Sequence, residues 1–285
     1  MTAQQYALTF RNELPMAVIS TTPRSGTWYN HYLFGTYNNL LLGNPLKHVA
    51  AQNFDVLQGL QLNTSIVHAN CPGFEPSLDL APLQGVRGNP YAWGDLYLDA
   101  NPNWYSPERN SDTRYVFINR NPLDHCVSMY VHLRAHSDPT KSALVSGQTI
   151  DEYLLNCTVP NYIFRYLSFR DMSRTFPERI RIVSYESMIA DRKGTFLSML
   201  EFFRRTPTND DLVDLALEAA LPEKLQEHEF RVGVSLEGQK GQSHIRSGKT
   251  GNWRGVISDE ARQRARDEFL RWSIDFDALV FGGTI

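Results

Sequence analysis

The sequence predicts an α/β fold in which a mostly parallel central sheet is flanked by helices. Four short apolar runs have the length of buried strands, and longer segments of helical character separate them. This alternation is typical of parallel strands that are joined by helices. The four runs are residues 16–19, 65–68, 115–118 and 179–183. With 285 residues, 42% of them hydrophobic, the chain can bury the core of one large domain or of two small ones.

Composition argues against several classes of protein. The net charge of -3 gives no basic field for nucleic acid, and no apolar run approaches the ~18 residues of a membrane span. The N-terminus has no cleavable secretion signal, and Cys71, Cys126 and Cys157 have no metal-ligand spacing. An odd number of cysteines fits a reducing compartment. We therefore expect a cytoplasmic protein with no nucleic-acid partner, no membrane span and no bound metal.

The first apolar run leads into a loop that is suited to a phosphate group. Residues 20–26 are small or turn-forming, and an aromatic segment of helical length begins at Thr27. A strand, a tight loop and a helix together direct backbone N–H groups and the positive end of the helix toward an anion. Gly26 allows the backbone to approach a phosphate closely, and Arg24 adds a charged fork. Ser25 and Thr27 add hydroxyl donors.

This loop lacks the groups that bind a nucleoside triphosphate with magnesium. That motif reads G-x-x-x-x-G-K-[ST]. Aligned on Gly26, its first glycine falls on Thr21, its lysine on Thr27 and its magnesium-binding hydroxyl on Trp28. The loop therefore fits a phosphate without bound magnesium. Taken alone, these residues fit a phosphate loop and an ordinary strand-to-helix turn equally well.

The second strand, at residues 65–68, ends at a histidine. His68 alone is weak support for catalysis, because a histidine at a strand end is more often held by the backbone. Residues 74–114 follow, and they are rich in proline, glycine, asparagine and aromatic residues. Such a long irregular stretch usually serves function or flexibility, so we interpret it as a lid or an acceptor-binding region.

The third strand, at residues 115–118, leads into a helix with clear start signals. Asn121 fits the N-cap, Pro122 fits the first helical position and Asp124 fits the acidic N3 position. Arg120 lies between the end of the strand and this helix start.

The remainder of the chain continues the alternation. Residues 137–149 are polar and are expected to form a loop, and Thr149 is expected to cap the helix that follows. Thr208 and Asp211 fit a capping box. Residues 230–255 are expected to form a second loop, rich in glycine and charge. Helices are expected at residues 161–173, 191–204, 210–220 and 258–274.

Polar side chains follow the ends of all four predicted strands. Ligands of parallel α/β sheets bind beyond the carboxyl ends of the strands. The four side chains that we therefore expect at one edge of the sheet are Arg24, His68, Arg120 and Tyr185.

Four segments, in this order, resemble motifs of the sulfotransferases that use 3'-phosphoadenosine 5'-phosphosulfate (PAPS). Residues 22–27 are similar to the family's 5'-phosphosulfate loop, in which arginine replaces lysine in many carbohydrate-type members. Residues 120–128 are similar to its 3'-phosphate motif, R-N-x-x-D-x-x-x-S. Residues 183–188 resemble its R-Y-E-D-M segment, and residues 246–253 resemble its C-terminal loop R-K-G-x-x-G-D-W. The ordered set is far more specific than any one motif.

The resemblance implies a P-loop-containing nucleotide-binding fold and a single sulfotransferase-like domain over residues 1–285. It implies PAPS as donor and adenosine 3',5'-bisphosphate (PAP) as product, without a metal. The acceptor would be a hydroxyl or an amine of a small molecule or a carbohydrate-like compound. His68 would be the general base, and Arg24 would also stabilise the departing phosphate. The residues that the resemblance assigns to the donor are Arg24, Ser25, Gly26, Thr27, Trp28, Arg120, Ser128, Tyr185, Arg246 and Gly248.

The chain departs from the family's motifs at several positions. Ser247 replaces a lysine, Asn252 replaces an aspartate, and no lysine lies two residues before His68. The dimer signature of cytosolic members is absent after Trp253, so the oligomeric state stays open. Trp28 fits a stacking position for adenine and an ordinary core position equally.

Two alternatives to a sulfotransferase remain. The first is a non-catalytic nucleotide-binding protein of the same fold, which the incomplete segment around His68 allows. The second is a P-loop kinase, which the missing lysine and the pairing of Arg120 with Ser128 disfavour. The arginine-type loop favours a carbohydrate acceptor, whereas the missing secretion signal and anchor favour a cytosolic small molecule.

Overall fold

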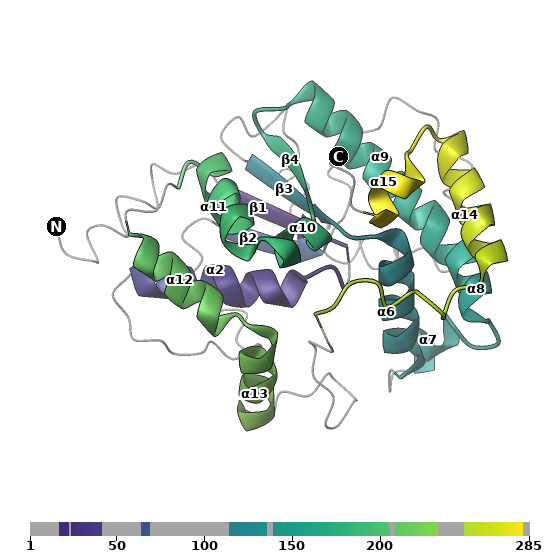
Figure 1. Cartoon of the computed structure of the whole chain (residues 1–285), viewed down its shortest axis with the longest axis horizontal. Helices are drawn as coiled ribbons and strands as arrows, with labels where there is room; N and C mark the ends of the chain where they lie inside the picture. The colour runs from purple at the N-terminus through teal and green to yellow at the C-terminus, as the bar shows by residue number, and fades with distance from the viewer. Residues whose placement is uncertain are drawn as a thin grey trace.

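In the computed structural model, the described strands form one sheet and helices lie around it (Figure 1). The described residues are 17–22, 24–41, 64–68, 114–135, 139–205, 209–232 and 248–281.

The described sheet has four parallel strands in the order β2-β1-β3-β4. This confirms the α/β fold with a parallel sheet, and each strand lies within two residues of its predicted bounds. The strands are β1 Ala17–Thr21, β2 Thr64–His68, β3 Arg114–Asn119 and β4 Ile180–Ser184. Parallel strands require crossover connections, and described helices lie in the chain between β1 and β2 and between β3 and β4.

The register aligns the carboxyl ends of the four strands. Thr21, the last residue of β1, pairs with His68 of β2 on one side and with Ile118 of β3 on the other. Asn119, the last residue of β3, pairs with Ser184 at the end of β4. The segments that follow the strands therefore leave the sheet at one common edge, as the sequence predicts.

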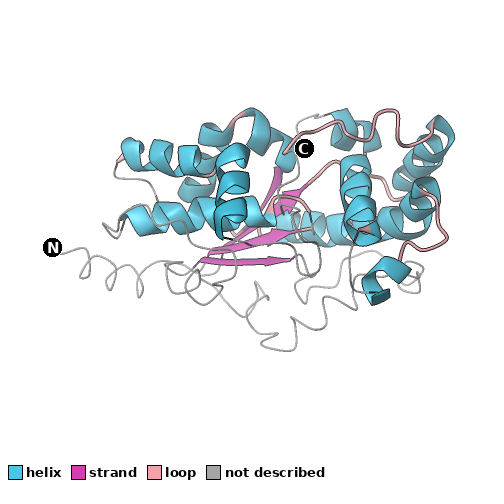
Figure 2. Cartoon of the chain, turned by 90° about the horizontal axis from the view of Figure 1, so that it is seen from below, coloured by secondary structure: helices cyan, strands magenta, loops and turns pink. Residues whose placement is uncertain are grey.

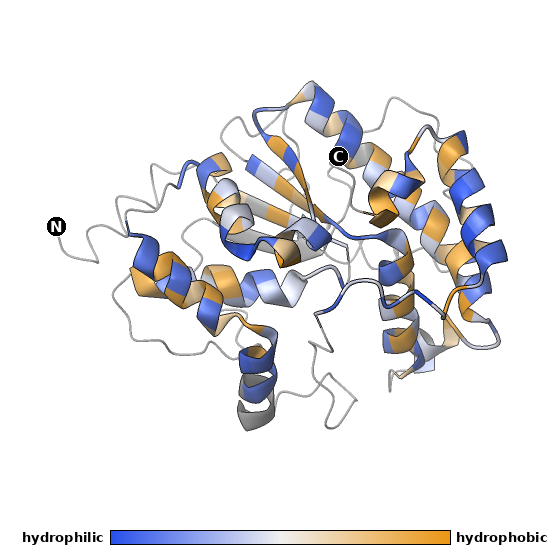
Figure 3. Cartoon of the chain, in the orientation of Figure 1, coloured by the Kyte–Doolittle hydropathy of each residue, from blue (hydrophilic) through white to orange (hydrophobic). Residues whose placement is uncertain are grey.

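One face of the sheet is covered by α2 and by helices that follow β4. Ile19, Val116 and Ile118 belong to the apolar cluster on this face. Figure 3 shows hydrophilic and hydrophobic residues together along α12, as expected for a helix that covers a core with one face. The helices on this side of the molecule are α2 Thr27–Leu41, α10 Tyr185–Ala190, α11 Arg192–Phe202, α12 Asp210–Ala219 and α13 Pro222–Val232.

The other face of the sheet packs against α9, Val159–Thr175. Tyr115 and Phe117 alternate with Val116 and Ile118 and therefore point to this side, because successive side chains of a strand face opposite ways. The ring of Phe117 stacks on Phe169 of α9, with 4.0 Å between the ring centroids.

A separate helical cluster lies beside the sheet and supports α6, which begins at its carboxyl edge. Figures 1 and 2 show the strands between this cluster and the group of helices around α2 and α12. The cluster contains α6 Pro122–Arg134, α8 Ile150–Tyr153, the π-helical segment Leu154–Thr158, α9, α14 Asp259–Arg271 and α15 Phe276–Phe281.

Several local predictions are confirmed and others are wrong. Asn121 caps α6, and Thr149 forms a capping box at the start of α8. Residues 137–149 were expected to be a loop, but they contain α7, Pro139–Ala143, which begins at a proline, a residue favoured at a helix start. The capping box predicted from Thr208 and Asp211 is wrong, because the N-cap of α12 is Asn209, whose side chain accepts a hydrogen bond from the backbone of Asp211.

Three more helices, α10, α13 and α15, lie outside the sequence predictions. α13 extends to Val232, so the first residues of the expected loop 230–255 are helical. α15 follows α14 as a separate short helix, and the expected helix 258–274 ends at Arg271.

No helix among the residues that the structure describes is long and apolar enough to cross a membrane.

Candidate functional site

The loop between β1 and α2 is held together by its own polar groups. The backbone N–H of Ser25 donates to the carbonyl oxygen of Thr22 at 3.0 Å. The hydroxyls of Thr22 and Ser25 share a hydrogen bond, and so do those of Thr21 and Thr27. Ser25 and Thr27 are buried. Their hydroxyls, predicted to bind a phosphate, thus also stabilise the loop.

Gly26 is required by its backbone conformation and by its neighbours. Its φ of 89° lies in the left-handed region that favours glycine. A Cβ atom here would lie 3.1 Å from Met188 Cε and 3.1 Å from the ring of Tyr185. The carbonyl oxygen of Gly26 accepts hydrogen bonds from the backbone and the side chain of Asn30, each at 2.9 Å. Met188 and Tyr185 therefore pack closely against this glycine, and a larger side chain would crowd them whether or not a phosphate binds.

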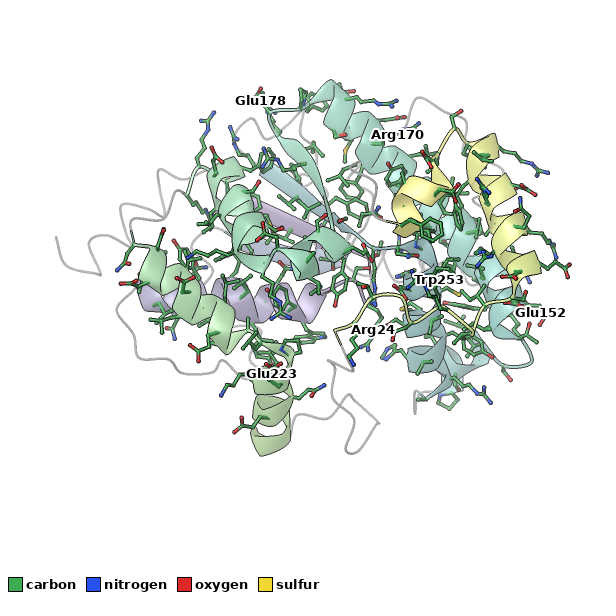
Figure 4. All side chains as sticks on the ribbon, in the orientation of Figure 1. Arg24, Glu152, Arg170, Glu178, Glu223 and Trp253 are labelled. Atoms are coloured by element: carbon green, nitrogen blue, oxygen red, sulfur yellow. The ribbon has the colours of Figure 1, made fainter. Side chains whose placement is uncertain are left out.

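Arg24 connects this loop with α6. Its Nε–H donates to the Oγ of Ser128 at 3.4 Å. Figure 4 places Arg24 where the start of α2, α6 and the segment after Gly248 meet. The structure therefore brings together two residues that lie 104 positions apart and that the sequence analysis assigned to one site.

Arg120 is a buried cation that donates its hydrogen bonds to backbone carbonyl groups. Its side chain is 6% exposed. Nη1 donates to the carbonyl oxygen of Arg24 at 2.6 Å, and Nη2 donates to that of Lys249 at 3.4 Å. The guanidinium lies over the ring of Tyr185, with 4.6 Å from Cζ to the ring centroid. Nε has no hydrogen-bond partner in the described part of the chain. The described hydrogen-bond partners are all neutral, and the Glu186 carboxyl nearby interacts electrostatically with Arg120. A buried guanidinium whose Nε is unused fits an anionic ligand.

The helix that carries Ser128 is fixed at its start by Asn121. The Oδ1 of Asn121 accepts hydrogen bonds from the backbone of Leu123 at 2.9 Å and of Asp124 at 3.4 Å. Its Nδ2 donates to the carbonyl oxygen of Val280 in α15 at 3.0 Å. Ser128 is buried in the second turn of this helix.

Residues 248–253, here called the C-terminal segment, reach the same edge of the sheet. Gly248 has a φ of 62°, and a Cβ atom there would lie 3.2 Å from Pro222 at the start of α13. The Nδ2 of Asn252 donates to the carbonyl oxygen of Lys249 at 2.8 Å. The aspartate that the family has at this position could not donate this bond when ionised. The departure at Asn252 therefore has a structural role within the segment.

The comparisons with known proteins decide the family. The model of the sulfotransferase domain family matches residues 14–276. The chain belongs to the sulfotransferase family. No curated protein sequence matches it significantly.

Solved sulfotransferases share the fold at low sequence identity. Mouse sulfotransferase SULT7A1, complexed with PAP, matches with a TM-score of 0.57 and 12% identity, over 95% of this chain and 89% of that chain. Retinol dehydratase in complex with androsterone and PAP matches with a TM-score of 0.53 and 16% identity, over 95% and 84%. Retinol dehydratase in a complex with retinol and PAP matches with a TM-score of 0.51 and 16% identity, over 95% of this chain and 85% of that chain. Identities this low show a common fold.

Tyr185 and Glu186, in the third motif of this sulfotransferase, occupy the first turn of α10. The buried ring of Tyr185 lies under the Arg120 guanidinium, and burial raises the pKa of its hydroxyl. The Oε1 of Glu186 accepts a hydrogen bond from the backbone of Asn121 at 3.1 Å. Burial raises the pKa of the Glu186 carboxyl, and the hydrogen bonds and Arg120 partly offset this.

Two site residues were not assigned from the sequence. The Glu186 carboxylate accepts a hydrogen bond from the backbone at the start of α6. The carboxylate of Asp124 accepts hydrogen bonds from two backbone N–H groups of the C-terminal segment. The signal was present, because both residues lie inside motifs of the family resemblance. Trp28 is partly buried and packs against the apolar cluster that contains residues of α2.

The remaining predicted residues lie partly or wholly outside the described part of the chain. His68 ends β2 and pairs with Thr21, so its backbone reaches the predicted edge, but its side chain lies outside the described residues. Arg246, Ser247 and the expected lid up to residue 113 also lie outside them. Among the side chains that are described, no group of three or more His, Cys, Asp or Glu could hold a metal ion.

Proposed function

We propose that this sulfotransferase transfers the sulfuryl group of PAPS to a hydroxyl or amine of a small-molecule or carbohydrate-like acceptor. The observation that carries the proposal is the buried Arg120 guanidinium, whose described hydrogen-bond partners are carbonyl oxygens. A ligand phosphate beside it would accept a charge-assisted hydrogen bond from the unused Nε. Family membership and the PAP complexes of the structural neighbours make PAPS the natural donor.

The phosphate loop would act on the leaving group. In an in-line displacement, the bond between sulfur and the bridging phosphate oxygen breaks while the acceptor oxygen or nitrogen bonds to sulfur. Negative charge then develops on the 5'-phosphate. Arg24, the amides after Gly26 and the positive end of α2 would stabilise this charge. Arginine stays protonated, so Arg24 acts electrostatically and not as an acid.

The opposite end of the donor would lie at Arg120 and Ser128. Arg120 is buried just before α6 and Ser128 in its second turn, and Arg24 contacts the Ser128 hydroxyl. Gly248 and Arg246 would complete this 3'-phosphate site from the C-terminal side. Recognition of a 3'-phosphate would distinguish PAPS from adenylates that lack it.

The acceptor would lose its proton to His68. The backbone of His68 lies at the end of β2, beside Thr21 and next to the phosphate loop. A neutral imidazole can take a proton near neutral pH, since its reference pKa is ~6.5. Positioning by the protein would supply the remainder of the rate enhancement.

The structural neighbours suggest where to begin with the acceptor. Retinol dehydratase is seen with androsterone and with retinol, which are small apolar molecules. The arginine-type loop suggests carbohydrate alcohols as a second group. We further propose a single domain over residues 1–285 and a cytoplasmic location.

A transfer assay tests this function. Purified protein is incubated with sulfur-labelled PAPS, with apolar alcohols or with sugars, and with excess EDTA. We expect labelled sulfate ester from at least one acceptor class, and a roughly hundredfold slower rate in Arg24→Ala. PAP binding without transfer to any acceptor would favour the non-catalytic alternative instead.

A further inference from the structure

Asp124 joins α6 to the C-terminal segment. Its Oδ2 accepts a hydrogen bond from the backbone N–H of Gly251 at 2.6 Å, and its Oδ1 accepts one from that of Trp253 at 3.2 Å. These partners lie 127 and 129 positions later in the chain. Both oxygens of one carboxylate are thus bound to one short stretch of backbone.

This linkage is not the local role that the position of Asp124 suggests. An acid at N3 usually stabilises the start of its own helix. In α6 the side chain of Asn121 accepts the N-terminal hydrogen bonds. Asp124 is 1% exposed, and the two amides from the C-terminal segment compensate its burial with charge-assisted hydrogen bonds.

The C-terminal segment has a fixed anchor on its other side. Trp253 is buried in the helical cluster beside the sheet, and Arg254 and Arg262 lie over its ring. Figure 4 shows Trp253 between α6 and the helices α14 and α15. The Asp124 carboxylate therefore sets where the segment passes α6 on its way from Gly248 to this anchor.

The position of the C-terminal segment determines one of the contacts of Arg120. Its Nη2 donates to the carbonyl oxygen of Lys249, two residues before Gly251. Moving the segment would move both this carbonyl group and Gly248 relative to the guanidinium.

We propose that Asp124 is a positioning residue for the 3'-phosphate end of the donor site. It acts through the C-terminal segment and does not itself touch the donor. This inference rests on the proposed function, because it assigns the 3'-phosphate to Arg120 and Gly248.

The test is Asp124→Asn, which keeps the side-chain volume but replaces one acceptor oxygen by an NH2 group that faces a backbone N–H. The probes are PAP and AMP, titrated by calorimetry. We expect PAP affinity to fall roughly tenfold or more, and AMP affinity to fall less than threefold, so that the preference for PAP shrinks. The ratio of the two affinities is unaffected by a smaller folded fraction.

Asp151→Asn is the matched control. The Oδ1 of Asp151 accepts a hydrogen bond from the backbone of Ser258 at 3.1 Å. It thus ties down a later part of the same chain, at the start of α14, away from Arg120. We expect this variant to leave the ratio of PAP to AMP affinity unchanged.

The possible outcomes distinguish a failure of the inference about Asp124 from a failure of the proposed function. Wild-type protein without a preference for PAP would defeat the proposed function. A wild-type preference that Asp124→Asn retains in full would defeat the role of Asp124 alone. If Asp124→Asn does not fold, hydrogen exchange on the wild-type protein decides. Slow exchange at the Gly251 and Trp253 amides supports the linkage, and exchange at the rate of a free peptide overturns it.

Discussion

The guanidinium of Arg120 donates a 2.6 Å hydrogen bond to the carbonyl oxygen of Arg24. This bond ties the residue after β3 to the loop after β1. Arg24 has a φ of 66°, a conformation that non-glycine residues rarely adopt. A strained backbone of this kind persists where its surroundings hold it, and the buried Arg120 supplies one such contact. The two predicted phosphate-binding arginines therefore form one unit.

Arg120→Ala tests this unit. We expect at least a tenfold loss of PAP affinity with a small change for AMP, because charge-assisted hydrogen bonds are the strong ones. Arg181→Ala is the control: Arg181 also lies over an aromatic ring, 4.5 Å from the centroid of Phe202, but outside the site. Titration calorimetry measures both variants. An Arg120→Ala protein with the wild-type ratio of PAP to AMP affinity would contradict the assignment.

Gly26→Ala should destabilise the fold more than Gly147→Ala. Both glycines have positive φ, 89° and 74°, so both variants are strained by roughly 1 kcal/mol or more. Only the Cβ atom at position 26 would meet close neighbours, at 3.1 Å, whereas none lies within 4 Å at position 147. We expect Gly26→Ala to lose roughly 1 to 3 kcal/mol more in urea unfolding. Equal losses would show that Met188 and Tyr185 simply move aside.

Glu186→Gln should change how stability depends on pH. Burial raises the pKa of the folded carboxyl above its ordinary value of 4.5. Between these two pKa values the folded protein binds more protons than the unfolded chain. The contribution of Glu186 to the free energy of unfolding therefore falls as pH rises through this window. Relative to the wild type, Glu186→Gln should become more stable from pH 4 toward pH 7 in urea unfolding.

Glu152→Gln is a control in which the stability relative to the wild type should change with pH in the opposite direction. The hydrogen bonds from Thr149 lower the pKa of the exposed Glu152 carboxyl, so its stabilisation is present above pH 4.5 and is lost as pH falls. Relative to the wild type, this variant should become less stable as pH rises. The same pH trend in both variants would contradict the buried environment of Glu186.

His68→Ala should lower turnover roughly a hundredfold or more, as expected for loss of a general base. PAP affinity should persist, because the proposed phosphate contacts come from other residues. His132→Ala, near the end of α6, is the matched histidine control. Steady-state rates with labelled PAPS measure the effect. Near-full activity in His68→Ala would remove the residue from the mechanism.

The sequence was most informative where a structure depends on neighbouring residues. The strands follow from short apolar runs, and Asn121 and Thr149 cap their helices through contacts within three residues. The position of Asp124 in α6 was likewise predictable. Its partners were not, because Gly251 and Trp253 lie more than 120 residues later and no local pattern indicates that pairing.

The errors have physical reasons of the same kind. α7 occupies a polar stretch in which Pro139 signals a turn as readily as a helix start. α15 has only six residues, too few to show helical periodicity. The crowding at Gly26 comes from Met188 and Tyr185, which the fold brings there from α10. Each feature depends on tertiary contacts that a local pattern cannot reveal.

The most direct measurement is calorimetric titration of the purified protein with PAP, AMP and magnesium-ATP in parallel. A PAPS-dependent sulfotransferase with the 3'-phosphate at Arg120 and Ser128 should bind PAP much more tightly than AMP, and should not prefer magnesium-ATP. Absence of PAP binding, or a preference for magnesium-ATP, would contradict the proposed donor site.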